Sequence, residues 1–134
     1  MKIAVLGGGA WGTALADHLA RGGEPVCLWA RDPAVVREIT AGHANEAHLP
    51  GHRLVDTLQA TTDAGAAVKD SGVVVNATPS HAVRSVLGRL EPAIPRNAVL
   101  VNASKGIELD SLTFMSGVVQ ETLPGRRFVV LSGP

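Results

Sequence analysis

The sequence predicts an α/β domain in which a doubly wound, mostly parallel sheet is covered by helices on both faces. Short runs rich in Val, Ile, Leu and Ala alternate with helical segments along all 134 residues, as in strands joined by helical crossovers. Hydrophobic residues make up 46% of the chain but aromatic residues only 3%, so aliphatic side chains must build the core. This length supports one domain, which we place at residues 1–134.

The first half of the chain predicts three strands and three helices. Apolar, β-branched runs indicate strands at 2–6 and 26–30 and a weaker one at 58–61. Helical periodicity and breaker residues indicate helices at 10–21, 32–39 and 63–69. Asp32 followed by Pro33 is typical of an N-cap and a first helical residue. Residues 42–58 show no sustained period, and a loop of this length is often functional.

The second half continues the alternation. Strands are expected at 73–77, 98–103 and 128–131, and helices at 80–90, with Ser80 as its cap, and at 112–123. Right-handed crossovers would bring the carboxyl ends of these parallel strands to one edge of the sheet. Trp29 is expected in the core, and Cys27 is expected to be a buried free thiol that packs as a small hydrophobe.

Composition argues against several classes of partner. Twelve basic residues balance twelve acidic ones, so no overall field favours nucleic acid or an anionic membrane. The N-terminus lacks the pattern of a signal peptide and no stretch approaches about 18 apolar residues, so a soluble cytoplasmic protein is expected. His43, His48 and His52 crowd the long loop, but Pro50 and Gly51 interrupt any helical ligand spacing, and we expect no metal site.

A glycine-rich loop follows the first strand and opens the first helix. In "KIAVLGGGAWGTALA", Gly7, Gly9 and Gly12 form a G-x-G-x-x-G pattern in the strand–loop–helix context that this fingerprint requires. Gly7 would allow the tight turn, Gly9 the approach of the backbone to a pyrophosphate, and Gly12 close packing of helix on sheet. The free N–H groups of the helix N-terminus would then bind the phosphates. The pattern predicts a Rossmann-type dinucleotide-binding domain, although a glycine turn without ligand has the same sequence.

The residue at the end of the second strand bears on the choice of cofactor. A dinucleotide fold usually carries an acid about twenty residues after the loop, on the ribose 2′-OH. Counting from Gly12, 31 − 12 = 19 leads to Arg31. A guanidinium suits a 2′-phosphate and accepts no hydrogen bond from a 2′-OH, which favours NADP and leaves NAD possible. The alternative is a solvated surface arginine, and neighbouring Asp32 is better explained as the helix cap.

Six motifs in order carry a family resemblance over essentially the whole chain. They are "GGGAWGTALA", "LWARD", "NEAHLPG", "NATPSH", "VNASKGIE" and "LSGP". With them the chain closely resembles the N-terminal part of bacterial NAD(P)-dependent glycerol-3-phosphate dehydrogenases. The resemblance implies an enzyme that interconverts dihydroxyacetone phosphate and sn-glycerol 3-phosphate by hydride transfer. Its substrate would be a small phosphate compound, and its product would supply phospholipid synthesis.

The resemblance also implies site residues. Ala10, Trp11 and Arg31 would contact the cofactor, Lys105 both cofactor and substrate, and Gly133 the substrate. Two residues depart from the family pattern: Ala10 stands where Ser is usual, and His48 stands where a Tyr or Phe contacts the cofactor. Trp11 is equally compatible with packing between domains.

Residues outside the motifs complete the expectations. From its place after the fourth strand, Pro79 is expected beside the nicotinamide. His81 lacks an indicated acid partner for a catalytic dyad with Ser80. The family's catalytic lysine belongs to a helical domain expected beyond Pro134, so no catalytic residue is assigned in this chain, and the uncovered apolar patch would favour self-association. The alternatives are ketopantoate reductase, a related two-domain enzyme, and a stand-alone regulatory module that binds NAD(P) without turnover.

Overall fold

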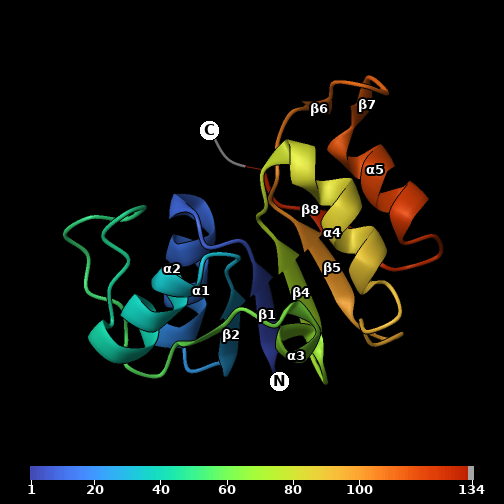
Figure 1. Cartoon of the computed structure of the whole chain (residues 1–134). Helices are drawn as coiled ribbons and strands as arrows, with labels where there is room; N and C mark the ends of the chain where they lie inside the picture. Colours follow the sequence, from blue (N-terminus) through green and yellow to red (C-terminus); the bar gives the residue numbers. More distant parts are fainter. Residues whose placement is uncertain (133–134) are drawn as a thin grey trace.

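A single parallel sheet forms the centre of the molecule (Figure 1). The computed structural model describes residues 1–132. The strands of the sheet are β1 (Ile3–Leu6), β2 (Val26–Trp29), β3 (Gln59–Thr61), β4 (Val73–Asn76), β5 (Val99–Asn102) and β8 (Phe128–Val130). Their order is β3-β2-β1-β4-β5-β8, and each neighbouring pair is parallel. The order reverses direction between β1 and β4, which is the point where such sheets bind ligands. The predicted fold class is confirmed.

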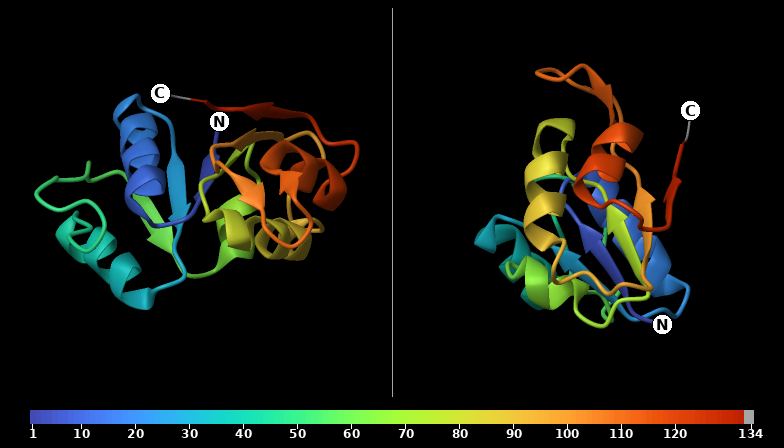
Figure 2. Two further views of the ribbon diagram at one scale, coloured as in Figure 1. Left: turned by 90° about the horizontal axis from the view of Figure 1, so that it is seen from above. Right: turned by 90° about the vertical axis from the view of Figure 1, so that its right-hand side faces the viewer.

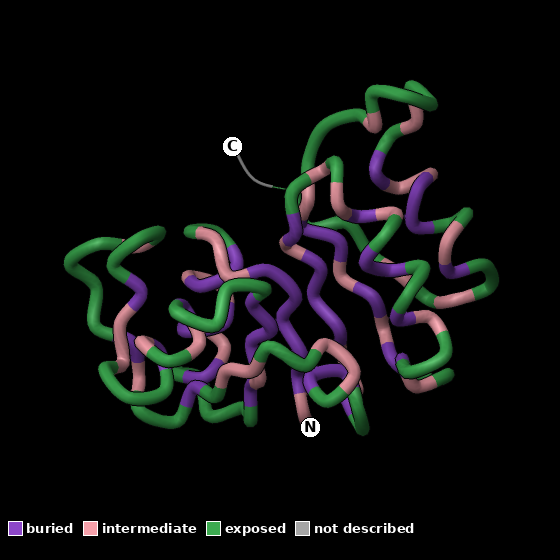
Figure 3. Tube along the Cα trace, viewed as in Figure 1, coloured by how far each residue is buried: buried purple, intermediate pink, exposed green. Residues whose placement is uncertain are grey.

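Alternating side chains of the strands pack against helices on both faces of the sheet. From β1, Ala4 and Leu6 join the core beneath α3 (Ala64–Val68), α4 (Val83–Leu90) and α5 (Met115–Thr122). Ile3 and Val5 join the opposite core, beneath α1 (Ala10–Arg21) and α2 (Pro33–Arg37). A strand exposes successive side chains to opposite faces, so one apolar run supplies both cores. Figure 3 shows β1 buried along its length, and β4 is buried from Val74 to Asn76.

Two helix boundaries differ from the predictions. The helix expected to end near residue 39 continues as a π-helical turn, Glu38–Gly42, and ends at His43, which has φ 51°. The prediction that Ser80 caps a helix is wrong. Ser80 belongs to a 3₁₀ turn, Ser80–Ala82, whose N-cap position is Pro79, and α4 then begins at Val83 without a side-chain cap.

The helix expected over 112–123 is instead a short antiparallel hairpin followed by a shorter helix. Strands β6 (Ile107–Glu108) and β7 (Thr113–Phe114) pair with each other, and α5 begins only at Met115. Leu112 has φ 56°, which is incompatible with a right-handed α-helix at this position. A positive φ is uncommon for leucine, so the sequence did not indicate it. The hairpin projects beyond the helices in the right-hand view of Figure 2. The side chains of Leu109 and Phe114 in this hairpin are exposed.

The predictions for Trp29 and Cys27 have different outcomes. Trp29 is 7% exposed and its Nε1 donates to the carbonyl of Thr62 at 2.9 Å, so its placement in the core is confirmed. Cys27 is only partly buried, which corrects the expectation of a buried thiol. Its partial burial raises the pKa of the thiol. Among the helices of residues 1–132, none has both the length and the apolar character needed to span a bilayer.

Candidate cofactor-binding site

A cavity of about 970 Å³ lies at the carboxyl ends of β1, β2, β4 and β5. This volume is in the range of sites that bind small molecules and cofactors. All the residues predicted to contact a cofactor line it, although the chain brings them from five separate segments: Gly7, Gly9, Ala10, Trp11, Gly12, Arg31, His48, Pro79 and Lys105. Gly133, predicted to contact substrate, lies outside the described residues.

The three glycines of the fingerprint have different surroundings. Gly7 has φ 118°, and a Cβ there would lie 2.6 Å from the carbonyl oxygen of Ala77 in the neighbouring strand segment. A Cβ on Gly12 would overlap the carbonyl oxygen of Gly7, so the first turn of α1 packs directly on the loop. A Cβ on Gly9 would meet no atom within 4 Å. Gly7 and Gly12 are therefore required by packing, whereas Gly9 keeps open the space in front of the loop.

The N-terminus of α1 faces this cavity. Gly9 is its N-cap, no side chain caps the helix, and its first turn contains no acidic residue. Ala10, Trp11 and Gly12 line the cavity, and the side chain of Trp11 is half exposed. The first N–H groups of a helix have no partner within the helix, and the helix dipole makes this end positive. The arrangement suits an anion such as a pyrophosphate.

Two neighbouring side chains after β2 differ in their partners. Asp32 Oδ1 accepts a hydrogen bond from the Ala34 N–H at 2.9 Å, which confirms its prediction as the cap of α2. Arg31 is exposed and lines the cavity. Within residues 1–132 its guanidinium has no hydrogen bond or ion pair. The cation beside the cavity is thus available to a ligand, whereas the nearest carboxylate is engaged in capping.

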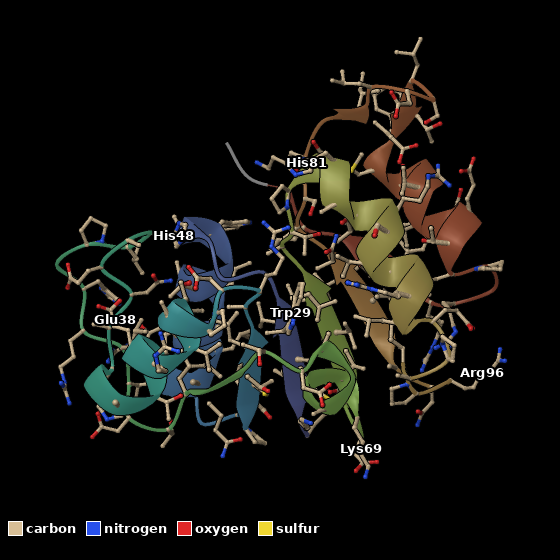
Figure 4. All side chains as sticks on the ribbon, viewed as in Figure 1. Trp29, Glu38, His48, Lys69, His81 and Arg96 are labelled. Carbon is tan, nitrogen blue, oxygen red and sulfur yellow. The ribbon has the colours of Figure 1, made fainter. Side chains whose placement is uncertain are left out.

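Asn45, which sequence reasoning missed, attaches the long loop to the glycine loop. Its side chain is fully buried, and its Nδ2 donates to the Gly8 carbonyl at 3.0 Å and to Thr13 Oγ1 at 2.9 Å. Three residues later His48 is exposed and lines the cavity. Figure 4 shows His48 beside the start of α1, across the edge of the sheet from His81. Asn45 therefore brings a loop without regular structure to a fixed place at the site.

A buried carboxylate, Asp17 of α1, anchors the far end of the same loop. Its side chain is 4% exposed and accepts from Arg21 Nε at 2.8 Å, from the Val55 N–H at 2.7 Å, and pairs with His52 Nε2 at 2.9 Å. Burial by itself would raise the pKa of Asp17, but the bonds from His52, Arg21 and Val55 outweigh it, so the pKa is lowered. Within residues 1–132 no three His, Cys, Asp or Glu side chains are grouped to hold a metal.

Replacing this carboxylate is expected to destabilise the fold in a pH-dependent way. We expect Asp17→Asn to lower the free energy of unfolding by about 2 to 4 kcal/mol at pH 7, because Arg21, His52 and the Val55 N–H lose the buried, ionised acceptor that they share. Since the folded-state pKa is lowered, the stabilisation is fully present above the pKa of about 3.9 of an unfolded aspartate and is lost as the pH falls through the folded value. Urea unfolding at pH 7 and at pH 3 measures both effects.

Asp56→Asn is the matched control in the same loop. Asp56 is 70% exposed and pairs with Arg53 at 2.9 Å. Such surface pairs contribute little, so a change below about 0.5 kcal/mol is expected. The assigned role of the Asp17 carboxylate would be contradicted if Asp17→Asn lowered the free energy of unfolding as much at pH 3 as at pH 7.

Comparison with known proteins identifies the family. Residues 2–134 match the model of the NAD-dependent glycerol-3-phosphate dehydrogenase N-terminus. The chain belongs to this family. The NAD(P)-dependent glycerol-3-phosphate dehydrogenase of Nitratidesulfovibrio vulgaris is 48% identical over 136 residues, which cover the whole of this chain and 41% of that relative. The chain therefore spans about two fifths of the length of the enzymes it resembles.

Solved structures agree with this assignment. The crystal structure of glycerol-3-phosphate dehydrogenase from Coxiella burnetii is 35% identical with a TM-score of 0.90, and the match covers 99% of this chain and 41% of that one. A ketopantoate reductase from Ralstonia eutropha is 24% identical with a TM-score of 0.66, over 97% of this chain and 40% of that one. The second likeness shows a shared fold alone. The chain is thus more similar to the glycerol-3-phosphate dehydrogenase than to the ketopantoate reductase, the alternative within two-domain reductases.

Proposed function

We propose that this chain is the cofactor-binding domain of a glycerol-3-phosphate dehydrogenase that prefers NADP to NAD. The observation that carries the preference is Arg31, an exposed guanidinium without a protein partner in residues 1–132, at the end of β2 where the ribose of the adenosine half is bound in this fold. Asp32, the nearest carboxylate, already caps α2. A planar guanidinium forms paired hydrogen bonds with a phosphate and offers no acceptor to a 2′-OH.

The residues of the cavity fit a dinucleotide along its length. The uncapped N-terminus of α1 and the open space at Gly9 would hold the pyrophosphate, with Ala10 and Trp11 beside it. His48 would contact the cofactor from the long loop, in place of the family's aromatic ring. Pro79 would lie beside the nicotinamide, at the carboxyl end of β4. When bound, the cofactor supplies the hydride for reduction of a ketone.

Lys105 is proposed to contact cofactor and substrate together. It lines both the large cavity and a second one of about 350 Å³, between β5, the start of α5 and the end of β8. The two cavities share Ser104 and Lys105. An ammonium at this junction would orient a phosphate or polarise a carbonyl placed next to the nicotinamide. We propose dihydroxyacetone phosphate as that substrate, and supply of sn-glycerol 3-phosphate for phospholipid synthesis in the cytoplasm, on the family resemblance.

Titration calorimetry with NADPH and NADH tests the cofactor preference. We expect the native chain to bind NADPH about ten- to a hundredfold more tightly, because a bidentate contact between arginine and phosphate contributes about 1.5 to 3 kcal/mol. Arg31→Asp should remove that advantage, while Arg37→Asp, on the exposed side of α2, serves as a control for the change in net charge. Equal affinities for both cofactors, unchanged in Arg31→Asp, would contradict the preference.

A further inference from the structure

Two asparagines occupy matching positions at the carboxyl ends of adjacent strands. Asn76 ends β4 and Asn102 ends β5, and the two are directly paired in the register of the sheet. They are 1% and 2% exposed, and the positions on this face in β1, β4 and β5 are otherwise apolar. Burying an amide side chain in the core costs free energy unless its hydrogen bonds are made. The hydrogen-bond partners of Asn76 and Asn102 therefore indicate the role of the two side chains.

The Asn76 amide makes all four hydrogen bonds available to it. Its Nδ2 donates to Asn102 Oδ1 at 2.9 Å and to Ser104 Oγ at 3.1 Å. Its Oδ1 accepts from the hydroxyl and the backbone N–H of Thr78, at 2.7 and 3.3 Å. Ser104 Oγ in turn donates to the Thr78 carbonyl at 2.5 Å, which closes a ring through Asn76, Ser104 and Thr78.

Backbone groups fix the orientation of both amides. The Thr78 N–H can only donate, so the Asn76 atom that faces it must be Oδ1. The Ser104 carbonyl can only accept, so the Asn102 atom that faces it, at 3.1 Å, must be Nδ2. Every link in this network, formed by Asn76, Asn102, Thr78 and Ser104, therefore has one possible direction, and a satisfied network of this kind is rigid.

The network ends directly at the wall of the large cavity. Thr78 immediately precedes Pro79, and Ser104 immediately precedes Lys105, and all four line the cavity. Asn76 lies behind that wall, in the sheet. The adenosine half of a dinucleotide belongs to the side of Arg31 and the pyrophosphate to the glycine loop, so the nicotinamide half falls on the side of β4 and β5. The network thus joins the two segments that face the nicotinamide.

We propose that Asn76 is a positioning residue for the nicotinamide half of the site. It holds the segments of Pro79 and Lys105 at a fixed separation without touching the ligand. This inference rests on the proposed function, because it assumes a dinucleotide in the large cavity. It predicts that a change at Asn76 affects the nicotinamide half of the cofactor and spares the adenosine half.

The test compares whole and half cofactor on Asn76→Asp. This substitution keeps the shape but exchanges the donating Nδ2 for an oxygen that faces Asn102 Oδ1. NADPH and adenosine 2′,5′-bisphosphate, which lacks the nicotinamide half, are titrated by calorimetry against the native chain and the variant. We expect the affinity for NADPH to fall about tenfold or more, as for loss of one or two hydrogen bonds to the positioned segments. The affinity for the bisphosphate should change less than about twofold.

Two further variants keep the result interpretable. Ser104→Ala removes the two hydrogen bonds that the Ser104 hydroxyl makes in the ring. This variant leaves the Asn76 pair with Asn102 in place, is expected to fold even where Asn76→Asp does not, and should shift the ratio of the two affinities in the same direction by a smaller factor. Val118→Ala, in the buried face of α5, lowers stability without touching the network, and should leave the ratio unchanged. Equal losses for both ligands, or no loss for either, in folded Asn76→Asp and Ser104→Ala would overturn the inference. Failure of the native chain to bind either ligand would overturn the proposed function and this inference with it.

Discussion

The Gly9→Val substitution is expected to abolish cofactor binding while leaving the fold intact. A Cβ on Gly9 meets no protein atom within 4 Å, and its φ of −75° is accessible to any residue, so the chain itself tolerates a side chain there. The valine would instead fill the space in front of the uncapped N–H groups of α1. Loss of two charge-assisted hydrogen bonds costs about 3 kcal/mol or more, which is at least about a hundredfold in affinity.

Calorimetry with NADPH and thermal unfolding followed by circular dichroism measure the two halves of this prediction. Gly42→Val is a suitable control, because a Cβ on Gly42 likewise meets no atom within 4 Å, at the end of the π-helical turn rather than at the cavity. It should leave NADPH affinity unchanged. Undiminished binding by Gly9→Val would mean that the glycine loop is only a turn.

The Gly12→Ala substitution is expected to destabilise the fold by about 2 to 3 kcal/mol or more. The sign of this effect is opposite to the usual one, because alanine normally stabilises a helix by about 1 kcal/mol relative to glycine. Here the new Cβ would overlap the Gly7 carbonyl oxygen, part of the backbone, so the loop and the first turn of α1 would have to move apart.

Gly88→Ala provides the matched comparison. Gly88 lies on the exposed side of α4, and a Cβ there meets no atom within 4 Å. It should stabilise the protein by about 0.5 to 1 kcal/mol in the same urea-unfolding experiment. If Gly12→Ala also stabilised the protein, the close contact between Gly12 and Gly7 would be wrong. Substitutions at Gly9 and Gly12, three residues apart, are thus expected to impair different properties: cofactor binding at Gly9 and stability of the fold at Gly12.

The parts of the structure that could be predicted depend on contacts between neighbours in sequence. Apolar runs bounded by breakers located the inner strands β1, β2, β4 and β5, because a strand covered on both faces needs an unbroken apolar run. Asp32 followed by Pro33 located the start of α2 for a similarly local reason, since the cap bonds an N–H two residues away. The hairpin β6–β7 was missed because its turn places Leu112, not a glycine or asparagine, at positive φ.

The sequence by itself determined the fold class and the glycine loop. Both are marked by residue type and local spacing, and the carboxyl ends of parallel strands must meet at one edge. The family resemblance, rather than spacing, pointed to Ala10, Trp11 and His48 in the cavity lining. Only the tertiary structure decided how that edge is held in place. Asn45 reaches the glycine loop across 37 residues, Asp17 holds the Val55 N–H across 38, and Asn76 meets Asn102 across 26. The sequence does not indicate the partners of polar side chains such as these, because many donors and acceptors in the chain could bond them. The packing of distant segments in the folded sheet and loop decides which partners they meet.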